Sequence, residues 1–314
     1  MFCFFATMIS IPHKAKQFGV FIIKLLIVIG AFYFIYDKLT SDKSLNWEKF
    51  WELANEKFTS SVVFGLLLMS FANRFFEILK WKNLVSTIHT ISVGEATKQV
   101  LGALAAGIFT PNGIGEYAGK ALYFNKNQTK KVVFLNLICN GIQMILTIVF
   151  GTIGLFILGY WQWGFIIIGL SIFFFLFSIL SKKITIKGYS IEKLMNKINE
   201  IPKHVHNRNN LLALCRYLTF SHQYYFLFLV FGVDLPYATM MATIAVVYFL
   251  ASSLPSFQFL DFAVKGSVAV FFFGKLGVND WIVVFVATLM WFLNVVLLVV
   301  MGCYYVLKYK PKWN

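Results

Sequence analysis

Charged side chains are scarce in this sequence. They make up 13% of its 314 residues, whereas 59% of the residues are hydrophobic. A soluble domain carries roughly 25% charged residues, so this chain has too few polar groups to cover a water-facing surface. Its apolar residues gather instead in segments of about 20, the length that crosses a hydrocarbon core of ~30 Å. The composition excludes a soluble globular domain and indicates a polytopic α-helical membrane protein.

Sequence signatures of several chemistries are also missing. The four cysteines, at positions 3, 139, 215 and 303, have no paired spacing and predict neither a zinc site nor a disulfide framework. The close pair His204 and His206 lies in a basic loop without further ligands. There is no Gly-x-x-x-x-Gly-Lys loop and no Ser/His/Asp set. We therefore expect no metal, no cofactor and no nucleotide-driven step.

Basic residues outnumber acidic ones, and the formal net charge is +15. In a soluble protein this excess would indicate a nucleic-acid partner. Here the basic residues lie between apolar segments, as the positive-inside rule describes. We expect membrane lipids, and no nucleic acid, as partners. The apolar start lacks the basic region and cleavage site of a signal peptide, and either Met1 or Met8 is compatible with it.

Six apolar segments are long enough to span a membrane. Their ranges are about 18–36, 60–78, 132–158, 165–180, 211–231 and 281–305. Two further stretches, 95–124 and 236–273, each contain a proline and an acidic residue near the centre. This pattern favours a helix–break–helix hairpin that enters and leaves the same face. We predict an all-α polytopic membrane protein with about six transmembrane helices and two re-entrant hairpins, forming one integral membrane domain over residues 1–314.

The basic segments fall on one side of the membrane if both hairpins are re-entrant. They are residues 80–82, 126–131, the loop 181–210 and the tail 308–312. The positive-inside rule then places both termini in the cytoplasm, in a protein of the cytoplasmic (inner) membrane. The loop 181–210 has an apolar face opposite its lysines. This face fits an interfacial helix attracted by anionic lipid, and a plain positive-inside loop fits equally well.

The two hairpins resemble each other. Residues 110–121 read TPNGIGEYAGKA, and residues 254–266 read LPSFQFLDFAVKG. In each, a proline is followed by an acid–aromatic–Ala–x–Lys sequence. Flanking spans extend the repeats to about 60–158 and 211–305, and the span 165–180 between them makes the copies antiparallel. Inverted repeats with broken helices near the midplane are a transporter architecture.

The interruption in the first hairpin predicts a binding site. Pro111 removes a backbone donor and breaks the helix, while Gly113 and Gly115 permit a tight turn. The helix that restarts there points N–H groups, the positive end of its dipole, into a polar cavity that suits an anion or a phosphate. The second hairpin has Phe257 and Phe259 in place of the glycines.

Charged residues within apolar segments are the other site candidates. Glu116 with Lys120, and Asp261 with Lys265, have the i,i+4 spacing and order of helical ion pairs. Since a charge inside the membrane costs roughly 2.5–3.5 kcal/mol, such pairs either neutralise each other or face a cavity. We favour a binding role for the first pair and leave the second open.

A third charged group lies at the end of the second span. Arg74, Glu77 and Lys80 share one helical face there. The planar fork of Arg74 suits a phosphate, and an interfacial Arg–Glu anchor explains the pattern equally well. We interpret Arg216 as a side chain that snorkels to the interface.

The element Asn73-Arg74 to Lys80-Trp81-Lys82, followed by GIFTPNGIGEYAGK at 107–120, resembles the flippase-like, lysylphosphatidylglycerol synthase transmembrane-region family. The resemblance covers about residues 18–305, and its Pro-x-Gly-x-Gly-Glu core is the most specific part. It implies translocation of a phospholipid or a lipid-linked substrate. The residues that match family motifs are Arg74, Glu77, Pro111, Gly113, Gly115 and Glu116. Residues 255–261 have fewer glycines than the second family motif usually has.

Full-length synthases of that family carry a large soluble catalytic domain after the membrane part. No such domain follows the last apolar segment here, so we expect no aminoacyl transfer. The leading hypothesis is a flippase-like carrier of an anionic phospholipid, with a possible partner enzyme that supplies the lipid. The alternatives are an integral-membrane lipid-modifying enzyme, with Glu116 or Asp261 as general base, and a scaffold of a lipid or glycan synthesis complex.

Overall fold

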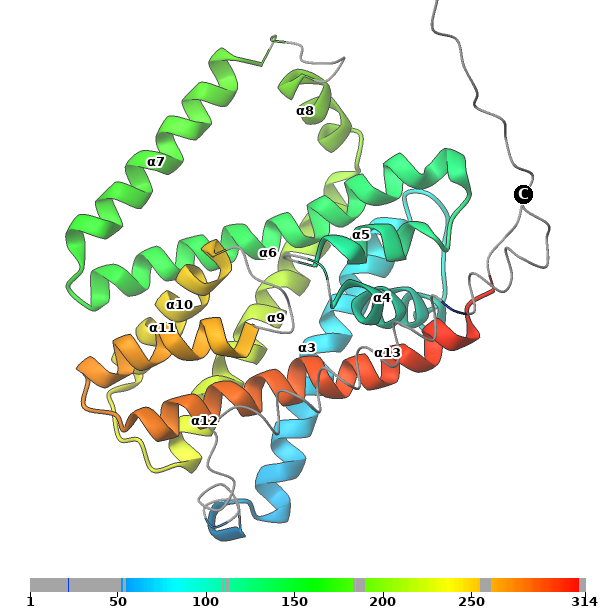
Figure 1. Cartoon of the computed structure of the whole chain (residues 1–314). Helices are drawn as coiled ribbons and strands as arrows, with labels where there is room; N and C mark the ends of the chain where they lie inside the picture. Colours follow the sequence, from blue (N-terminus) through cyan, green and yellow to red (C-terminus); the bar gives the residue numbers. More distant parts are fainter. Residues whose placement is uncertain are drawn as a thin grey trace, which may run out of the picture.

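The computed structural model describes residues 55–108, 113–182, 190–254 and 261–310, together with residues 22, 52, 110 and 184. Every long regular element in this part of the chain is a helix, so the all-α prediction is confirmed (Figure 1). The helices are α3 (Ser60–Val85), α4 (Val93–Gly107), α5 (Ile114–Ala121), η1 (Lys126–Gln128), α6 (Thr129–Ile157), α7 (Trp161–Leu180), α8 (Ile191–Asn199), α9 (Lys203–Val230), α10 (Tyr237–Ser253), α11 (Asp261–Lys275), α12 (Asp280–Trp291), η3 (Phe292–Val296) and α13 (Leu297–Lys308).

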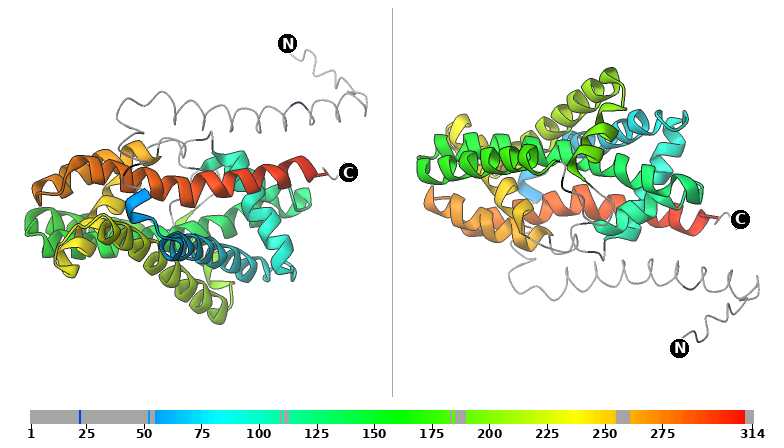
Figure 2. Two further views of the ribbon diagram at one scale, coloured as in Figure 1. Left: turned by 90° about the horizontal axis from the view of Figure 1, so that it is seen from below. Right: turned by 90° about the horizontal axis from the view of Figure 1, so that it is seen from above.

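Four helices among the described residues are long and apolar enough to cross a membrane: α3, η1 with α6, α7, and the continuous rod α12–η3–α13. Both views in Figure 2 show this rod running along one side of the bundle. The four match the predicted spans at 60–78, 132–158, 165–180 and 281–305. The predicted span 211–231 lies within α9, which begins at Lys203 with polar turns and does not meet the same criterion. The predicted span 18–36 lies outside the described residues.

Side-chain caps define where several helices begin. Ser92 Oγ accepts the Glu95 N–H at 3.1 Å, and Glu95 Oε2 accepts the Ser92 N–H at 2.9 Å. This capping box satisfies two backbone donors at the start of α4. The same bond from the Ser92 N–H holds the pKa of the Glu95 carboxyl below its ordinary value.

Each interrupted apolar stretch is divided into two helices, as predicted. α4 has 15 residues and α5 has 8, both shorter than the ~20 that a full crossing requires. They form an antiparallel hairpin in which Gly119 packs on Ala103: a Cβ at Gly119 would lie 2.9 Å from the Ala103 Cα. In the second stretch, α10 and α11 pack against each other.

Helices of the first half of the chain pack on helices of the second half, an arrangement that we call exchanged packing. α3 runs antiparallel to α9: Gln223 Nε2 donates to Leu66 O at 3.0 Å, and Asn83 Nδ2 donates to Val205 O at 2.8 Å. α4 packs on α13, and α10 packs on α6. The first hairpin helix of each half therefore rests on the last long helix of the other half.

Glycines allow the helix backbones to approach closely at both of these contacts. A Cβ at Gly154 on α6 would lie 2.6 Å from the Ala242 carbonyl oxygen on α10. A Cβ at Gly302 on α13 would collide with the Leu101 carbonyl oxygen on α4. Small residues at membrane helix contacts allow backbones to approach closely and gain dispersion energy.

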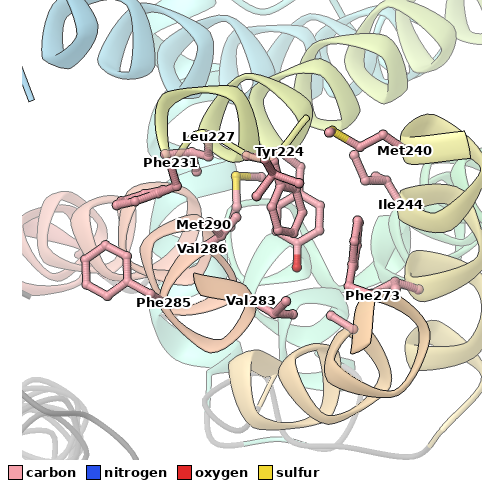
Figure 3. Packing of buried hydrophobic residues seen from close by; sticks show 14 of the residues in the cluster. Tyr224, Leu227, Phe231, Met240, Ile244, Phe273, Val283, Phe285, Val286 and Met290 are labelled. Atoms are coloured by element: carbon pink, nitrogen blue, oxygen red, sulfur yellow. The ribbon is translucent and has the colours of Figure 1, made fainter. Parts of the chain in front are cut away.

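The largest apolar core lies between α9, α10, α11 and α12. Figure 3 shows its side chains converging around Tyr224, with Met290 and Val286 from α12 and Phe273 from α11. The rings of Phe228 and Phe273 lie 4.3 Å apart. α7 lies apart from this core (Figure 1). Its aromatic residues are exposed along its length, which suits contact with lipid.

Candidate functional site

A cavity of about 790 Å³ lies inside the bundle, between helices of both halves of the chain. It is lined from α3, α4, α5, α6, α9, α10, α11, α12 and η3. Five of the residues selected from the sequence line it: Arg74, Glu77, Gly113, Glu116 and Lys265. The fold thus brings residues that are distant in the sequence to one place.

Glu77 is the centre of a charged cluster at this cavity. Its side chain is 5% exposed, and Arg216 Nη1 lies 2.9 Å from its Oε2. Lys80 Nζ, fully buried, lies 3.3 Å from the same oxygen. The interpretation of Arg216 as a snorkelling anchor is wrong, because its guanidinium pairs with Glu77 and donates to Asn73 Oδ1 at 3.2 Å. This ion pair joins α3 to α9 across the two halves.

Arg74 lies on the same wall of the cavity and is held by the rod α12–η3–α13. Its Nη2 donates to the backbone oxygen of Asn294 at 3.3 Å. Asn294 lies in η3, a short π-helical turn. Such turns leave the regular hydrogen-bond ladder and are frequent at functional sites.

The side chain of Asn294 continues the polar network. Its Oδ1 accepts from Asn73 Nδ2 at 2.7 Å, and its Nδ2 donates to Gln223 Oε1 at 3.0 Å. Gln223 Nε2 in turn donates to Ser70 Oγ at 2.7 Å. Our sequence reasoning missed Asn294, although a lone amide in the apolar segment 281–305 was a signal that could have found it.

Three buried donors on the cavity wall have no hydrogen-bond partner in the described structure. They are Arg74 Nε, Gln143 Nε2 and Trp291 Nε1. A buried donor left unpaired costs about 1–3 kcal/mol. All three are N–H groups, so what they lack is an acceptor. A ligand that is rich in oxygen acceptors would satisfy them.

The charges around the cavity also favour a ligand with acceptor oxygens and negative charge. Arg74, Arg216 and Lys265 line it, against the carboxylates of Glu77 and Glu116. Lys80 adds a further buried cation beside Glu77. Positive charge therefore exceeds negative charge, which favours an anion in a site of low dielectric constant.

Lys120 lies behind the cavity wall rather than in it. Its Nζ donates to Asn136 Oδ1 at 2.6 Å and lies 4.6 Å from the centre of the Trp81 ring. Its side chain is fully buried, and it is not among the residues that line the cavity. Lys120 therefore joins α5 to α3 and α6, and its assignment to substrate binding is not supported by this geometry.

The glycine turn before α5 differs in part from the prediction. Gly113 lies at φ 68° and caps α5, as a tight turn requires. The Gly115 N–H, however, donates to Thr110 Oγ1 at 2.7 Å, and the Glu116 N–H donates to Gly113 O at 2.9 Å. Two of the N–H groups predicted to bind an anion are thus already bonded within the protein.

The remaining candidates are only partly described. Pro111 and the side chain of Asp261 lie outside the described residues. Lys265 Nζ lies 4.9 Å from the centre of the Tyr248 ring at the cavity wall. Among the residues that the structure describes, no group of three or more His, Cys, Asp or Glu side chains could hold a metal ion.

Comparison with known proteins adds no assignment. No protein-family model, curated protein or solved structure matches this chain. The resemblance of residues 73–82 and 107–120 to the flippase-like family therefore stays an expectation from those motifs.

Proposed function

We propose that this chain is a flippase-like carrier that moves a phosphate-bearing, anionic lipid across the cytoplasmic membrane. The observation that carries this proposal is the set of unpartnered N–H donors of Arg74, Gln143 and Trp291 around one cationic cavity. A phosphate group offers negative charge and several acceptor oxygens to such donors. Arginine matches phosphate oxygens with two parallel N–H groups, which makes Arg74 the principal contact.

The size of the cavity fits a head group. Ligand pockets commonly measure about 300–1,000 Å³, and this one measures about 790 Å³. It would hold the polar part of one lipid, while the acyl chains would stay in the surrounding membrane. The paired charges of Glu77 and Arg216 fix the wall against which the head group binds.

The architecture that we propose has about six spans and two re-entrant hairpins in an inverted repeat, with both termini in the cytoplasm. Two observations support it. Corresponding helices of the two repeats have similar lengths: α3 and α9 have 26 and 28 residues, and α4 and α10 have 15 and 17. The exchanged packing of α4 on α13 and α10 on α6 is what a two-fold axis in the membrane plane produces. A cavity on such an axis can open to either side in turn.

The test is lipid movement in proteoliposomes. Purified protein is reconstituted with phosphatidylglycerol or phosphatidylcholine that carries a fluorescent head-group label, and dithionite quenching reports the label in the outer leaflet. We expect movement of the anionic lipid in the wild type, at least a ten-fold loss in Arg74→Gln and a smaller loss in Trp291→Phe. Trp163→Phe, which changes an exposed tryptophan of α7, is the matched control and should leave the rate unchanged.

Other outcomes would contradict the proposal. Equal movement in Arg74→Gln and wild type would show that the cavity donors do not bind the transported lipid. If no lipid moves and lipid analysis instead finds a chemical product that depends on Glu116, the enzyme alternative replaces the carrier.

A further inference from the structure

A second cavity, of about 650 Å³, lies where the end of α3, the start of α6 and the α8–α9 junction meet. It shares no lining residue with the central cavity. It belongs to the part of the chain in which the basic segments 126–131 and 181–210 meet. It is therefore a separate candidate binding site.

Basic residue types line this hollow from three helices, as three lysines and one histidine. Lys130 and Lys131 come from α6, Lys197 from α8 and His204 from α9. Among the described residues of the lining, Glu200 is the one that is acidic. Lys131 Nζ donates to the backbone oxygen of Thr87 at 3.0 Å, which holds that ammonium group at the wall. Three lysines against one carboxylate favour an anionic occupant.

Backbone donors add to this preference. α9 follows Pro202, which offers no side-chain cap, and the helix has 28 residues. The Val205 and His206 N–H groups both donate to Pro202 O, at 2.9 and 3.3 Å. Pro202, His204 and Val205 line the cavity, so the N-terminal end of α9, the positive end of its helix dipole, lies at the same wall as the lysines.

The floor of the hollow is apolar. It is formed by Phe134, Leu135, Ile201 and Val205, and the last three are buried. Beside it, α8 exposes Leu194 and Met195, which are 41% and 47% exposed. A helix with one apolar and one basic face lies in a membrane interface. An occupant with a charged head and an apolar body matches a cationic rim over an apolar floor better than a fully polar ion does.

We propose that this second cavity binds the phosphate group of an anionic phospholipid, which remains at the protein surface and is not the transported molecule. Lys130, Lys131 and Lys197 contact the phosphate oxygens, and the glycerol and first acyl carbons lie on Phe134 and Ile201. A free phosphate ion would share the head-group chemistry but would leave the apolar floor uncovered.

Native mass spectrometry of the full-length protein in detergent tests this site. The probes are phosphatidylglycerol and phosphatidylcholine with the same acyl chains, and inorganic phosphate as competitor. The pocket variant is Lys130→Gln/Lys131→Gln/Lys197→Gln. The matched control, Lys98→Gln/Lys182→Gln/Lys310→Gln, removes the same charge from exposed positions outside the cavity. Both are also made in the Arg74→Gln chain, so that lipid in the central cavity is not counted.

In the Arg74→Gln chain we expect phosphatidylglycerol to be retained at least five-fold more strongly than phosphatidylcholine. The pocket variant should lose this preference and keep its thermal midpoint, and the control variant should keep both. Equal losses in the two variants would show a diffuse charge effect and overturn the site. Phosphatidylcholine retained as strongly as phosphatidylglycerol would also overturn it. Complete displacement by millimolar phosphate would assign the cavity to a soluble ion and refute the lipid.

Discussion

Replacing Glu77 by glutamine tests how the charged cluster holds the two halves of the bundle together. The change leaves Lys80 fully buried beside a neutral amide, and it removes the partner of Arg216. Removing one member of a buried ion pair costs about 3–5 kcal/mol, because the other charge stays in a medium of low dielectric constant. Arg216 is 21% exposed, so most of this cost comes from Lys80. At about 2–4 °C per kcal/mol, the thermal midpoint in detergent should fall by on the order of 10 °C.

A second substitution makes this prediction specific to charge. Glu77→Gln/Lys80→Met removes the stranded ammonium with a side chain of similar length, and it should recover at least half of the loss. Glu192→Gln, on the exposed surface of α8, is the control and should change the midpoint very little. A fall of less than about 3 °C in Glu77→Gln, or a double variant no more stable than the single one, would refute the reasoning.

Three further predictions concern the network, the helix contacts and pH. Asn294→Ala removes the acceptor of Asn73 Nδ2 and the donor to Gln223 Oε1, and it should cost about 1–3 kcal/mol of unfolding free energy in a denaturant titration. Gly302→Ala should lower the thermal midpoint, because the added methyl group would collide with the α4 backbone. The control Gly169→Ala, in α7 where nothing lies near the added methyl group, should raise the midpoint slightly. Equal shifts in the two variants would contradict the packing of α13 on α4. The pKa of Glu95 is lower in the folded protein than in the unfolded chain. Its contribution to stability is therefore complete above the unfolded-state pKa and is lost as the pH falls through the folded-state pKa. The thermal midpoints of wild type and Glu95→Gln should differ at neutral pH and converge on acidification.

The positions of most helices could be predicted from hydropathy alone. The apolar segments 60–78, 132–158 and 165–180 match α3, α6 and α7, because a membrane imposes one length on an apolar helix. α9 shows the limit of this signal. It begins at Lys203, ahead of the predicted 211, since hydropathy cannot distinguish polar helical turns from a loop.

The site was predictable where it carries charge and at the glycine turn, where Gly113 was chosen for its backbone freedom and lines the cavity. Arg74, Glu77 and Glu116 were chosen as charged residues in apolar segments, and all three line the cavity. Gln143 and Trp291 were missed because a neutral amide or an indole becomes informative only when its N–H is seen buried without an acceptor.

The interaction partners of the charged residues could not be predicted from the sequence, because tertiary contacts decide them. The i,i+4 spacing paired Lys120 with Glu116, but the Lys120 ammonium lies against Asn136 and Trp81 from other helices. Arg216 was interpreted on its own helix, while its partner Glu77 lies on α3. Local spacing gives the nearest candidate partner, and packing decides between it and residues far along the chain.

The exchanged packing has a consequence for the order of events during synthesis. α4 ends at Gly107, and the helix that covers it, α13, begins at Leu297. At the ribosome's pace of about 5–20 residues per second, the small-residue face of α4 waits roughly ten to forty seconds for its partner. During that interval the face of α4 at Leu101 lacks its contact with Gly302 of α13. The first half of this protein thus completes its own packing only when the last helix leaves the ribosome.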